Sequence, residues 1–151
     1  MARKSKYGQP SAKLSTTLWA PALYIRLSRE DGDREESNSI ASQRELLTEF
    51  ANTQTDMAAP RLYTDDGCTG TDFDRPDFQR MLNDLRAGII NCVIVKDLSR
   101  FGRNYVGVGE YLEHEFPLLN VRFISVSDNV DSYLDPRSVN NLVVPFKNIL
   151  N

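Results

Sequence analysis

Short apolar runs alternate with segments of helical periodicity along this chain of 151 residues, and this alternation most limits the folds that it can adopt. The apolar runs are typical of strands and lie at 22–27, 61–65, 91–96 and from 121 onward. The segments between them predict helices over about 39–53, 76–88 and 105–118. Strands that are separated by helices usually pair in parallel. The pattern therefore predicts an α/β fold, a three-layer sandwich around a mainly parallel sheet of four or five strands.

The helix expected at 76–88 has the clearest boundaries in the sequence. Asp74 can cap its start, Pro76 suits its first turn, and Gly88 can end it. Its apolar residues have the spacing i, i+3, i+4 and i+7 and are Phe78, Met81, Leu82 and Leu85. The run NCVIVK follows directly, and its unbroken apolar character is typical of a strand buried on both faces.

Composition excludes several classes of function. The two cysteines, Cys68 and Cys92, have no partner at metal-ligand spacing, and the single histidine, His114, lies among glutamates on an expected helix surface. Zinc chemistry and Ser–His or Cys–His catalysis are therefore disfavoured. The net charge of −3 argues against DNA binding through a broad basic face. Any role with nucleic acid must depend on a local basic cluster or on a further basic domain.

No targeting or membrane segment is evident in the sequence. Residues 1–19 are expected to form a flexible basic tail without the apolar core of a signal peptide. No apolar run approaches the roughly 20 residues that a membrane span needs. These features predict a cytoplasmic protein.

Three expected strand ends carry unusual polar residues. The first strand ends with Arg26 and is followed by Ser28, and the loop after the second strand leads to Arg75. The third strand runs into the segment 96–103, KDLSRFGR, which contains Arg100 and Arg103. The carboxyl ends of parallel strands share one edge of a sheet, where ligands usually bind. One hydroxyl is therefore expected to face at least three arginines.

A hydroxyl among arginines suggests phosphoryl transfer. Attack on a phosphodiester needs a positioned nucleophile and cations that stabilise the charge on the non-bridging oxygens. Arginine suits the second task because its planar fork binds two phosphate oxygens and stays charged. Arg100 and Arg103 are three residues apart, so one helical turn is expected to aim both in a similar direction. Taken singly, each such residue is more often a surface residue or a helix cap than a catalyst, and Arg26 could face solvent at a sheet edge.

Three separated motifs in order resemble the catalytic domain of serine site-specific recombinases, the resolvase/invertase family. They are YIRLS at 24–28 with SIASQ at 39–43, DDGCTGTDFDRPDFQRML at 65–82, and VIVKDLSRFGRN at 93–104. The matches span about 22–124 with their spacing in register. The sequence is most similar to the large serine recombinases of mobile elements, in which VRFISVSDNVDS and PFKNILN are also familiar stretches.

The resemblance implies that Ser28 attacks DNA to form a 5′-phosphoseryl link and release a 3′-hydroxyl. It also implies that four arginines bind the scissile phosphate and that Gln43 supports the site; the arginines are Arg26, Arg75, Arg100 and Arg103. No metal, ATP or other cofactor is implied. Many small resolvases carry Asp where this sequence has Ser99. Asp97 is two residues earlier, a shift of about 6.5 Å if the strand continues, so the general base and acid stay open.

The resemblance also predicts the domain organisation and the partners. A catalytic domain is expected over 20–137, and a helical segment over 138–151 is expected to lead into a dimerisation helix and basic DNA-binding domains beyond Asn151. The expected partner is double-stranded DNA at specific recombination sites, with dimers and synaptic tetramers in the longer protein. The fragment alone is expected to bind DNA weakly and without specificity. The DNA site and the choice among integration, excision and inversion stay open.

Three alternatives compete with this interpretation. A phospho-receiver signalling domain has a similar fold, but its acidic pair follows the first strand, whereas Asp65 and Asp66 follow the second. A nucleotide-binding enzyme needs a glycine-rich phosphate loop after the first strand, and none is present. The third alternative is a non-catalytic recombinase remnant that acts only in protein–protein contact. Every recognised motif residue is present, so any loss of activity would have to be recent or lie in a further region.

Overall fold

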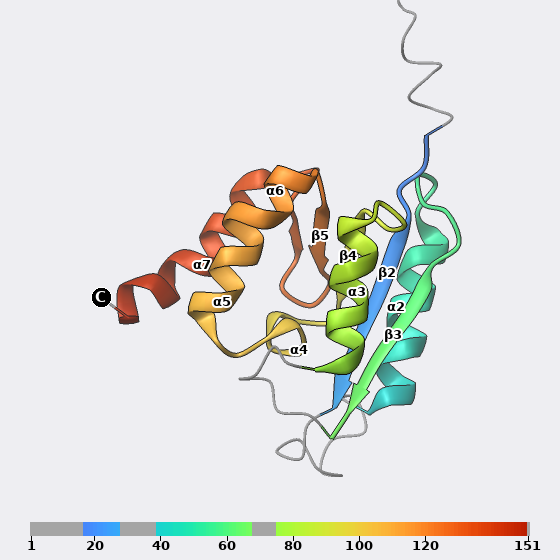
Figure 1. Cartoon of the computed structure of the whole chain (residues 1–151), viewed down its shortest axis with the longest axis horizontal. Coiled ribbons are helices and arrows are strands. Elements are labelled where there is room, and N and C mark those ends of the chain that lie inside the picture. The colour runs from blue at the N-terminus through green and yellow to red at the C-terminus, as the bar shows by residue number, and fades with distance from the viewer. Residues whose placement is uncertain (1–16, 28–38, 68–74, 151) are drawn as a thin grey trace, which may run out of the picture.

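A five-stranded sheet forms the centre of the protein, whose computed structural model describes residues 17–27, 39–67 and 75–150. Its order is β3-β2-β4-β5-β6 (Figure 1). The first four strands in the chain pair in parallel, and the short β6 is antiparallel to β5. The strands are β2 (Pro21–Leu27), β3 (Arg61–Asp66), β4 (Cys92–Val95), β5 (Arg122–Ser125) and β6 (Val130–Asp131). The predicted mainly parallel α/β sheet is confirmed.

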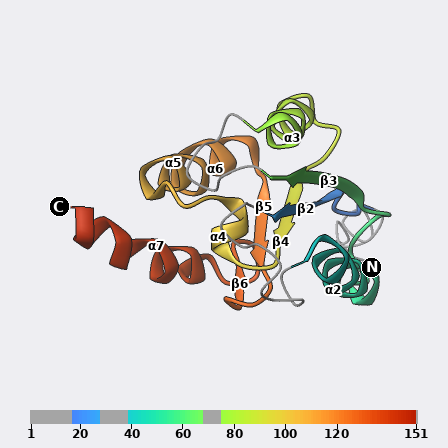
Figure 2. The ribbon, with the colours of Figure 1, turned by 90° about the horizontal axis from the view of Figure 1, so that it is seen from below.

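Helices cover both faces of this sheet. Figure 2 shows α2 and α3 on opposite sides of the strands, which gives the three layers. The helical segments are α2 (Ile40–Thr53), α3 (Pro76–Arg86), α4 (Leu98–Phe101), α5 (Tyr105–Glu110), a π-helical turn (Tyr111–Glu115), α6 (Phe116–Leu119) and α7 (Pro136–Leu150). Among the described residues, no helix is long and apolar enough to cross a membrane.

Two hydrophobic clusters hold the layers together, one on each face of the sheet. Leu23 and Ile25 of β2 pack with Leu47 of α2 in the smaller cluster. Tyr24, on the other face of the same strand, packs in the larger cluster with Phe78 of α3 and with residues of α5 and α7. Successive strand residues point to opposite faces, so β2 contributes to both cores. This double burial explains its almost continuous apolar sequence.

The ends of α2 and α3 show how local sequence determines the elements. Ser39 caps α2, because its side chain accepts a hydrogen bond from the Ser42 N–H. For α3 the N-cap position is Arg75, which makes no side-chain cap bond, and the expected cap, Asp74, lies outside the described residues. Gly88 follows α3 with a φ of +79°, as expected of a helix-ending glycine.

Three parts of the secondary structure differ from the sequence-based expectation. The helix expected at 105–118 is continuous but contains the π-helical turn at Tyr111–Glu115. The segment after β4 forms the additional short helix α4, whose N-cap is Asp97. The last helix begins at Pro136 and keeps Pro145 inside it.

The strand order creates a switch point at β2. The chain passes from β2 through α2 to β3 on one side, and then through α3 to β4 on the other side of β2. Ligands in open α/β sheets bind at the carboxyl ends of strands beside such a point. A ligand-binding site is therefore expected at the carboxyl ends of β2 and β4.

Candidate active site

Arg26 lies at the carboxyl end of β2 and is fully buried. The alternative of a solvent-facing Arg26 at a sheet edge is wrong, because β2 pairs with β3 on one side and with β4 on the other. Ser28, the expected nucleophile, lies outside the described residues. The described chain nevertheless reaches Leu27, so the surroundings of the strand end are defined.

Gln43 fixes the backbone of this strand end. Its side-chain Nε2 donates to the Arg26 carbonyl at 2.9 Å, and its Oε1 accepts from the Arg26 N–H at 3.4 Å. Gln43 is itself fully buried on α2. A buried amide that bonds both polar groups of one residue holds that backbone in place. Gln43 on α2 therefore holds the carboxyl end of β2 in place.

Arg75 approaches from the start of α3. Its guanidinium donates to the Phe101 carbonyl at 2.7 Å and to the Tyr24 hydroxyl at 3.1 Å. The same group lies 4.5 Å from the ring centroid of Phe78, a cation–π contact. Arg75 is only 1% exposed, so its charge is held inside the protein next to the segment that follows β4.

Tyr24 and Asp65 support Arg75, and the sequence motifs had given neither residue a role. The Tyr24 hydroxyl donates to Asp65 Oδ2 at 2.7 Å. Asp65 also accepts from the backbone N–H groups of Asp77 and Phe78, both at 3.0 Å. Burial, together with nearby Asp65, raises the pKa of Tyr24 far above its usual value, although Arg75 opposes the shift. Tyr24 is two residues before Arg26 on the same strand face. This spacing could have identified Tyr24 from the sequence.

Arg100 joins the group from α4. Its Nη1 donates to the Arg26 carbonyl at 3.0 Å, and Arg26 Nη2 donates back to the Ser99 carbonyl at 2.8 Å. This reciprocal pair ties the end of β2 to α4. The structure therefore brings Arg26, Gln43, Arg75 and Arg100 together at one edge of the sheet.

The expectation for Arg103 was wrong in its geometry. Helix α4 ends at Phe101, and Gly102 has an extended φ of 175°. Arg103 therefore follows the helix instead of sharing a turn with Arg100. It is half-buried, whereas Arg100 is buried.

Asp97 does not lie on a strand. Strand β4 ends at Val95, so the strand does not continue to Asp97 and the estimated shift along it does not apply. Asp97 instead begins the turn into α4, where its carboxylate accepts from the Arg100 N–H at 3.3 Å and from the Ser99 hydroxyl. Because the chain turns after β4, the Asp97 carboxylate lies beside the arginine cluster, which is formed by Arg26, Arg75 and Arg100.

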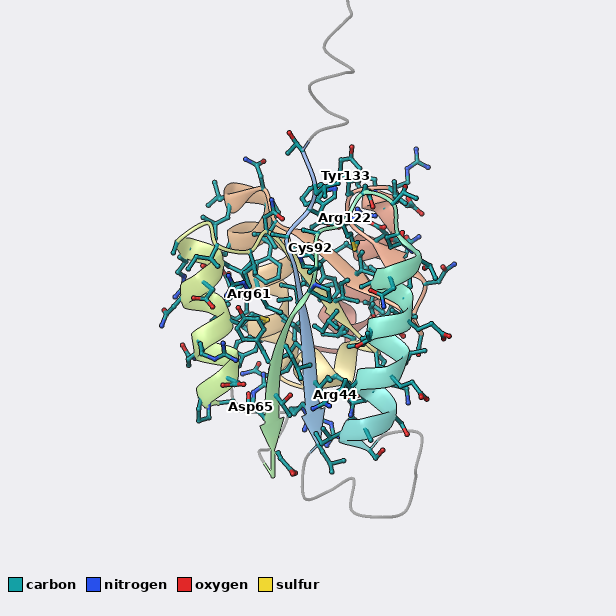
Figure 3. All side chains as sticks on the ribbon, turned by 90° about the vertical axis from the view of Figure 1, so that its right-hand side faces the viewer. Arg44, Arg61, Asp65, Cys92, Arg122 and Tyr133 are labelled. Carbon is teal, nitrogen blue, oxygen red and sulfur yellow. The ribbon has the colours of Figure 1, made fainter. Side chains whose placement is uncertain are left out.

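A buried cluster of guanidinium groups is suited to binding an anion. Arginine stays ionised, and its field is strong where water is excluded. Figure 3 shows Asp65 at this end of the sheet, with Arg122, Cys92 and Tyr133 toward the opposite end. The polar groups at the two ends therefore belong to separate networks.

Other titratable groups among the described residues lie outside the strand-end cluster. No group of three or more His, Cys, Asp or Glu residues among them is placed to hold a metal. Cys92 is buried, and burial raises the pKa of its thiol to about 12. His114 is exposed and pairs with Glu110. A cavity of about 540 Å³ lies between α6, β5 and α7, lined by groups such as Phe116, and it lies away from the strand-end arginines.

The sequence pattern of one family covers most of the chain. The family described as "Resolvase, N terminal domain" matches residues 22–147. This chain belongs to the resolvase family. The expected similarity to serine recombinases is confirmed, and the receiver-domain and nucleotide-binding alternatives are set aside. None of the curated protein sequences matches this resolvase-family chain.

Solved structures share this fold. The N-terminal catalytic domain of TP901-1 integrase has a TM-score of 0.71 at 24% identity, over 87% of this chain and 98% of that one. A resolvase family site-specific recombinase from Streptococcus pneumoniae has a TM-score of 0.64 at 28% identity, over 87% and 90%. The C-terminal catalytic domain of ISC1926 TnpA, an IS607-like serine recombinase, has a TM-score of 0.57 at 20% identity, over 72% and 68%.

Proposed function

We propose that this resolvase-family chain catalyses DNA strand exchange, with Ser28 as the nucleophile and the arginine cluster as the phosphate-binding group. One observation carries the proposal: buried arginines from β2, the start of α3 and α4 meet at the carboxyl end of β2, directly before Ser28. They are Arg26, Arg75 and Arg100. Membership of the resolvase family supports the same class of reaction.

The proposed step is a transesterification. The Ser28 oxygen attacks the phosphorus, a new P–O bond forms to the serine, and the bond from phosphorus to the 3′ oxygen breaks. The serine loses a proton and the 3′ oxygen gains one, so the step is balanced without ATP or a metal. The arginines stabilise the charge on the non-bridging oxygens as the phosphorus becomes five-coordinate. Rejoining is the reverse reaction with a 3′-hydroxyl of another strand.

We propose separate tasks for the neighbouring residues. Gln43 holds the Arg26 backbone in place. It thereby positions the chain that leads to Ser28, two residues later. Arg103, half-buried after α4, is proposed to contact the phosphate from the rim of the site. The general base and the acid for the leaving oxygen are not assigned. The non-catalytic alternative is an outcome of the test below.

The proposed partner is double-stranded DNA at specific recombination sites. We assign residues 20–137 to the catalytic domain, 1–19 to a basic tail, and 138–151 to a segment that leads to dimerisation and DNA-binding regions. Helix α7 begins at Pro136 and packs against the larger core through Val139 and Val143. Dimers and synaptic tetramers are proposed for the longer protein.

The test looks for a covalent protein–DNA adduct. The protein is produced as its natural gene encodes it, and a double-stranded DNA library tiling the region around that gene is the probe. Adducts that survive denaturant are recovered, and their DNA ends are sequenced. Ser28→Ala is expected to abolish the adduct, because no other group replaces the nucleophile. Ser127→Ala, at an exposed position, is the matched control and is expected to keep it.

Each outcome has a defined meaning. An adduct in the wild type and in Ser127→Ala, but not in Ser28→Ala, supports both the reaction and the nucleophile. An adduct that persists in Ser28→Ala removes Ser28 from the mechanism. Specific DNA binding without any adduct favours the non-catalytic remnant.

The 151-residue chain alone is expected to bind duplex DNA weakly. Its net charge is −3, so it gains little from the release of counterions around DNA. A dissociation constant of about 10 µM or weaker is expected near physiological salt, with no preference among sequences. Fluorescence anisotropy with two unrelated duplexes measures this. Tight, sequence-selective binding by the short chain would contradict the expectation.

A further inference from the structure

Asp97 and Ser99 form a polar pair at the start of α4, beside Arg100. The Ser99 hydroxyl donates to Asp97 Oδ1 and accepts from Arg100 Nε at 3.4 Å. Arg100 Nε and Asp97 Oδ1 form an ion pair at 3.7 Å, a distance longer than a hydrogen bond. The hydroxyl of Ser99 therefore connects a carboxylate to a guanidinium that the carboxylate does not itself hydrogen-bond.

The surroundings of this pair make the connection effective. The side chain of Arg100 is only 4% exposed, whereas that of Asp97 is 27% exposed. Charge interactions weaken little where water is excluded, and hydrogen bonds in a chain polarise one another. A hydroxyl that donates to a carboxylate is a better acceptor for the next donor in the chain. Arg100 is thus held from its Nε side, while its Nη1 donates to the Arg26 carbonyl.

We propose that the Asp97–Ser99 pair positions Arg100 for the scissile phosphate, with Asp97 acting through the Ser99 hydroxyl. This proposal rests on the proposed function. While no DNA is bound, the carboxylate of Asp97 neutralises part of the Arg100 charge. The Ser99 hydroxyl fixes the plane of the guanidinium. Both residues are positioning residues, because neither is assigned a contact with the reacting atoms.

A purely structural role for Asp97 is the competing explanation. Asp97 is the N-cap of α4 and accepts from the Arg100 N–H. Asparagine caps a helix about as well as aspartate, but it carries no charge. Asp97→Asn therefore keeps the cap and removes the carboxylate. A second carboxylate, Asp128, accepts from the Leu98 N–H at 2.8 Å at the start of the same helix. Asp128→Asn is the matched control for the integrity of α4.

The experiment uses the full gene-encoded protein and the DNA fragment that gives the Ser28-dependent adduct. Single-turnover adduct formation is followed at saturating protein, and DNA affinity is measured separately. Asp97→Asn and Ser99→Ala are each expected to slow adduct formation about tenfold or more, which corresponds to about 1.4 kcal/mol in the barrier. DNA affinity and the melting temperature are expected to stay close to wild type. Asp128→Asn is expected to keep the wild-type rate.

Two combined variants test whether the residues act together. The double variant Asp97→Asn/Ser99→Ala is expected to be no slower than either single variant, because each change breaks the same connection. Asp97→Asn/Ser99→Asp returns a carboxylate beside Arg100 and is expected to recover most of the rate. If Asp97 acted only as a helix cap, a carboxylate placed two residues later would not restore the rate.

The results that overturn this proposal differ from those that overturn the function. A wild-type rate in Asp97→Asn, additive effects in the double variant, or an equal loss in Asp128→Asn each removes the positioning role while the Ser28-dependent adduct remains. Absence of that adduct in the wild type removes the proposed function, and the positioning role with it.

Discussion

Buried arginines in this protein stabilise the fold and are also the proposed phosphate-binding groups. Arg26 and Arg100 exchange guanidinium-to-carbonyl hydrogen bonds across the end of β2, through the Arg26 and Ser99 carbonyls. A buried charge is tolerated only where such bonds satisfy it. Removing one of these side chains is therefore expected to affect the packing as well as the proposed phosphate contact. Their contributions to cleavage and to stability have to be measured separately.

Arg100→Ala and Arg103→Ala are expected to separate these two contributions. Both changes remove a proposed phosphate contact, and each is expected to reduce adduct formation by about 10²-fold or more. Arg100→Ala is also expected to lower the free energy of unfolding by about 2–3 kcal/mol, because the Arg26 carbonyl loses a buried donor. Arg103→Ala is expected to cost less than about 1 kcal/mol, since Arg103 is half-buried.

Urea unfolding of both variants, beside the adduct assay, gives the two quantities. Equal losses of stability would contradict the difference in burial. Normal cleavage by Arg103→Ala would remove that residue from the site.

At the scale of elements, Asp65 joins a strand to two neighbours. It ends the buried part of β3, accepts from the Tyr24 hydroxyl on β2, and accepts from the first N–H groups of α3. Those N–H groups have no partner within the helix and need one from outside it. A side chain from another strand therefore caps α3. The same carboxylate sets the position of Tyr24, to which Arg75 donates.

Asp65→Ala is expected to lower the free energy of unfolding by about 2–4 kcal/mol, because it removes a helix cap and leaves a buried hydroxyl without its acceptor. The neighbouring Asp66→Ala is the control. Asp66 is exposed, so its replacement is expected to change stability by no more than about 0.5 kcal/mol. Urea unfolding measures both. Similar stabilities of the two variants would show that Asp65 contributes no cap.

At the scale of the whole molecule, Arg122 joins distant segments at the end of the sheet opposite the site. Its guanidinium bonds both oxygens of Asp131, at 3.0 and 2.7 Å, and Asp56 at 3.1 Å. It also lies 5.5 Å from the ring centroid of Trp19 and 5.2 Å from that of Tyr133. The residue thus connects the segment before β2, the segment after α2, and the β5–β6 pair.

This network predicts loss of stability in acid. Burial raises the pKa of Asp131, but hydrogen bonds from Arg122 and from the Leu134 and Tyr133 N–H groups, together with the charge of Arg122, outweigh burial. These interactions hold the pKa below its ordinary value of 3.8. A carboxyl whose pKa is lower in the folded state stabilises the protein above about pH 4, and this contribution is lost as the pH falls through the folded pKa. Asp131→Asn is therefore expected to reduce the fall in unfolding free energy between about pH 5 and pH 2.5.

Asp135→Asn, at an exposed position nearby, is the control and is expected to keep the wild-type slope. Part of the slope is expected to remain in Asp131→Asn, because hydrogen bonding to Arg80 also lowers the pKa of Asp77. Chemical denaturation at several pH values measures this. An unchanged slope in Asp131→Asn would show that the pKa of that carboxyl is not lowered in the folded protein.

The elements could be predicted from the sequence because they depend on neighbouring residues. The apolar run of β4, the spacing of Phe78, Met81, Leu82 and Leu85 in α3, and the Ser39 cap are all local features. The motifs also selected Arg26, Gln43, Arg75 and Arg100, which the structure brings to one place. Their catalytic roles are the proposal made above. Local patterns were insufficient for the turn at Asp97 and for the position of Arg103.

The sequence by itself determined the longer helices, the four parallel strands and most of the polar residues at the strand ends. Only the tertiary structure decided which of those residues meet. Tyr24 and Asp65 are separated by 41 positions along the chain and come together because β2 pairs with β3. The Asp97 carboxylate reaches Ser99 because β4 ends early and the chain turns into α4. Hydrogen bonds are short and directional, so their partners depend on strand order and turn geometry, which residue spacing does not specify.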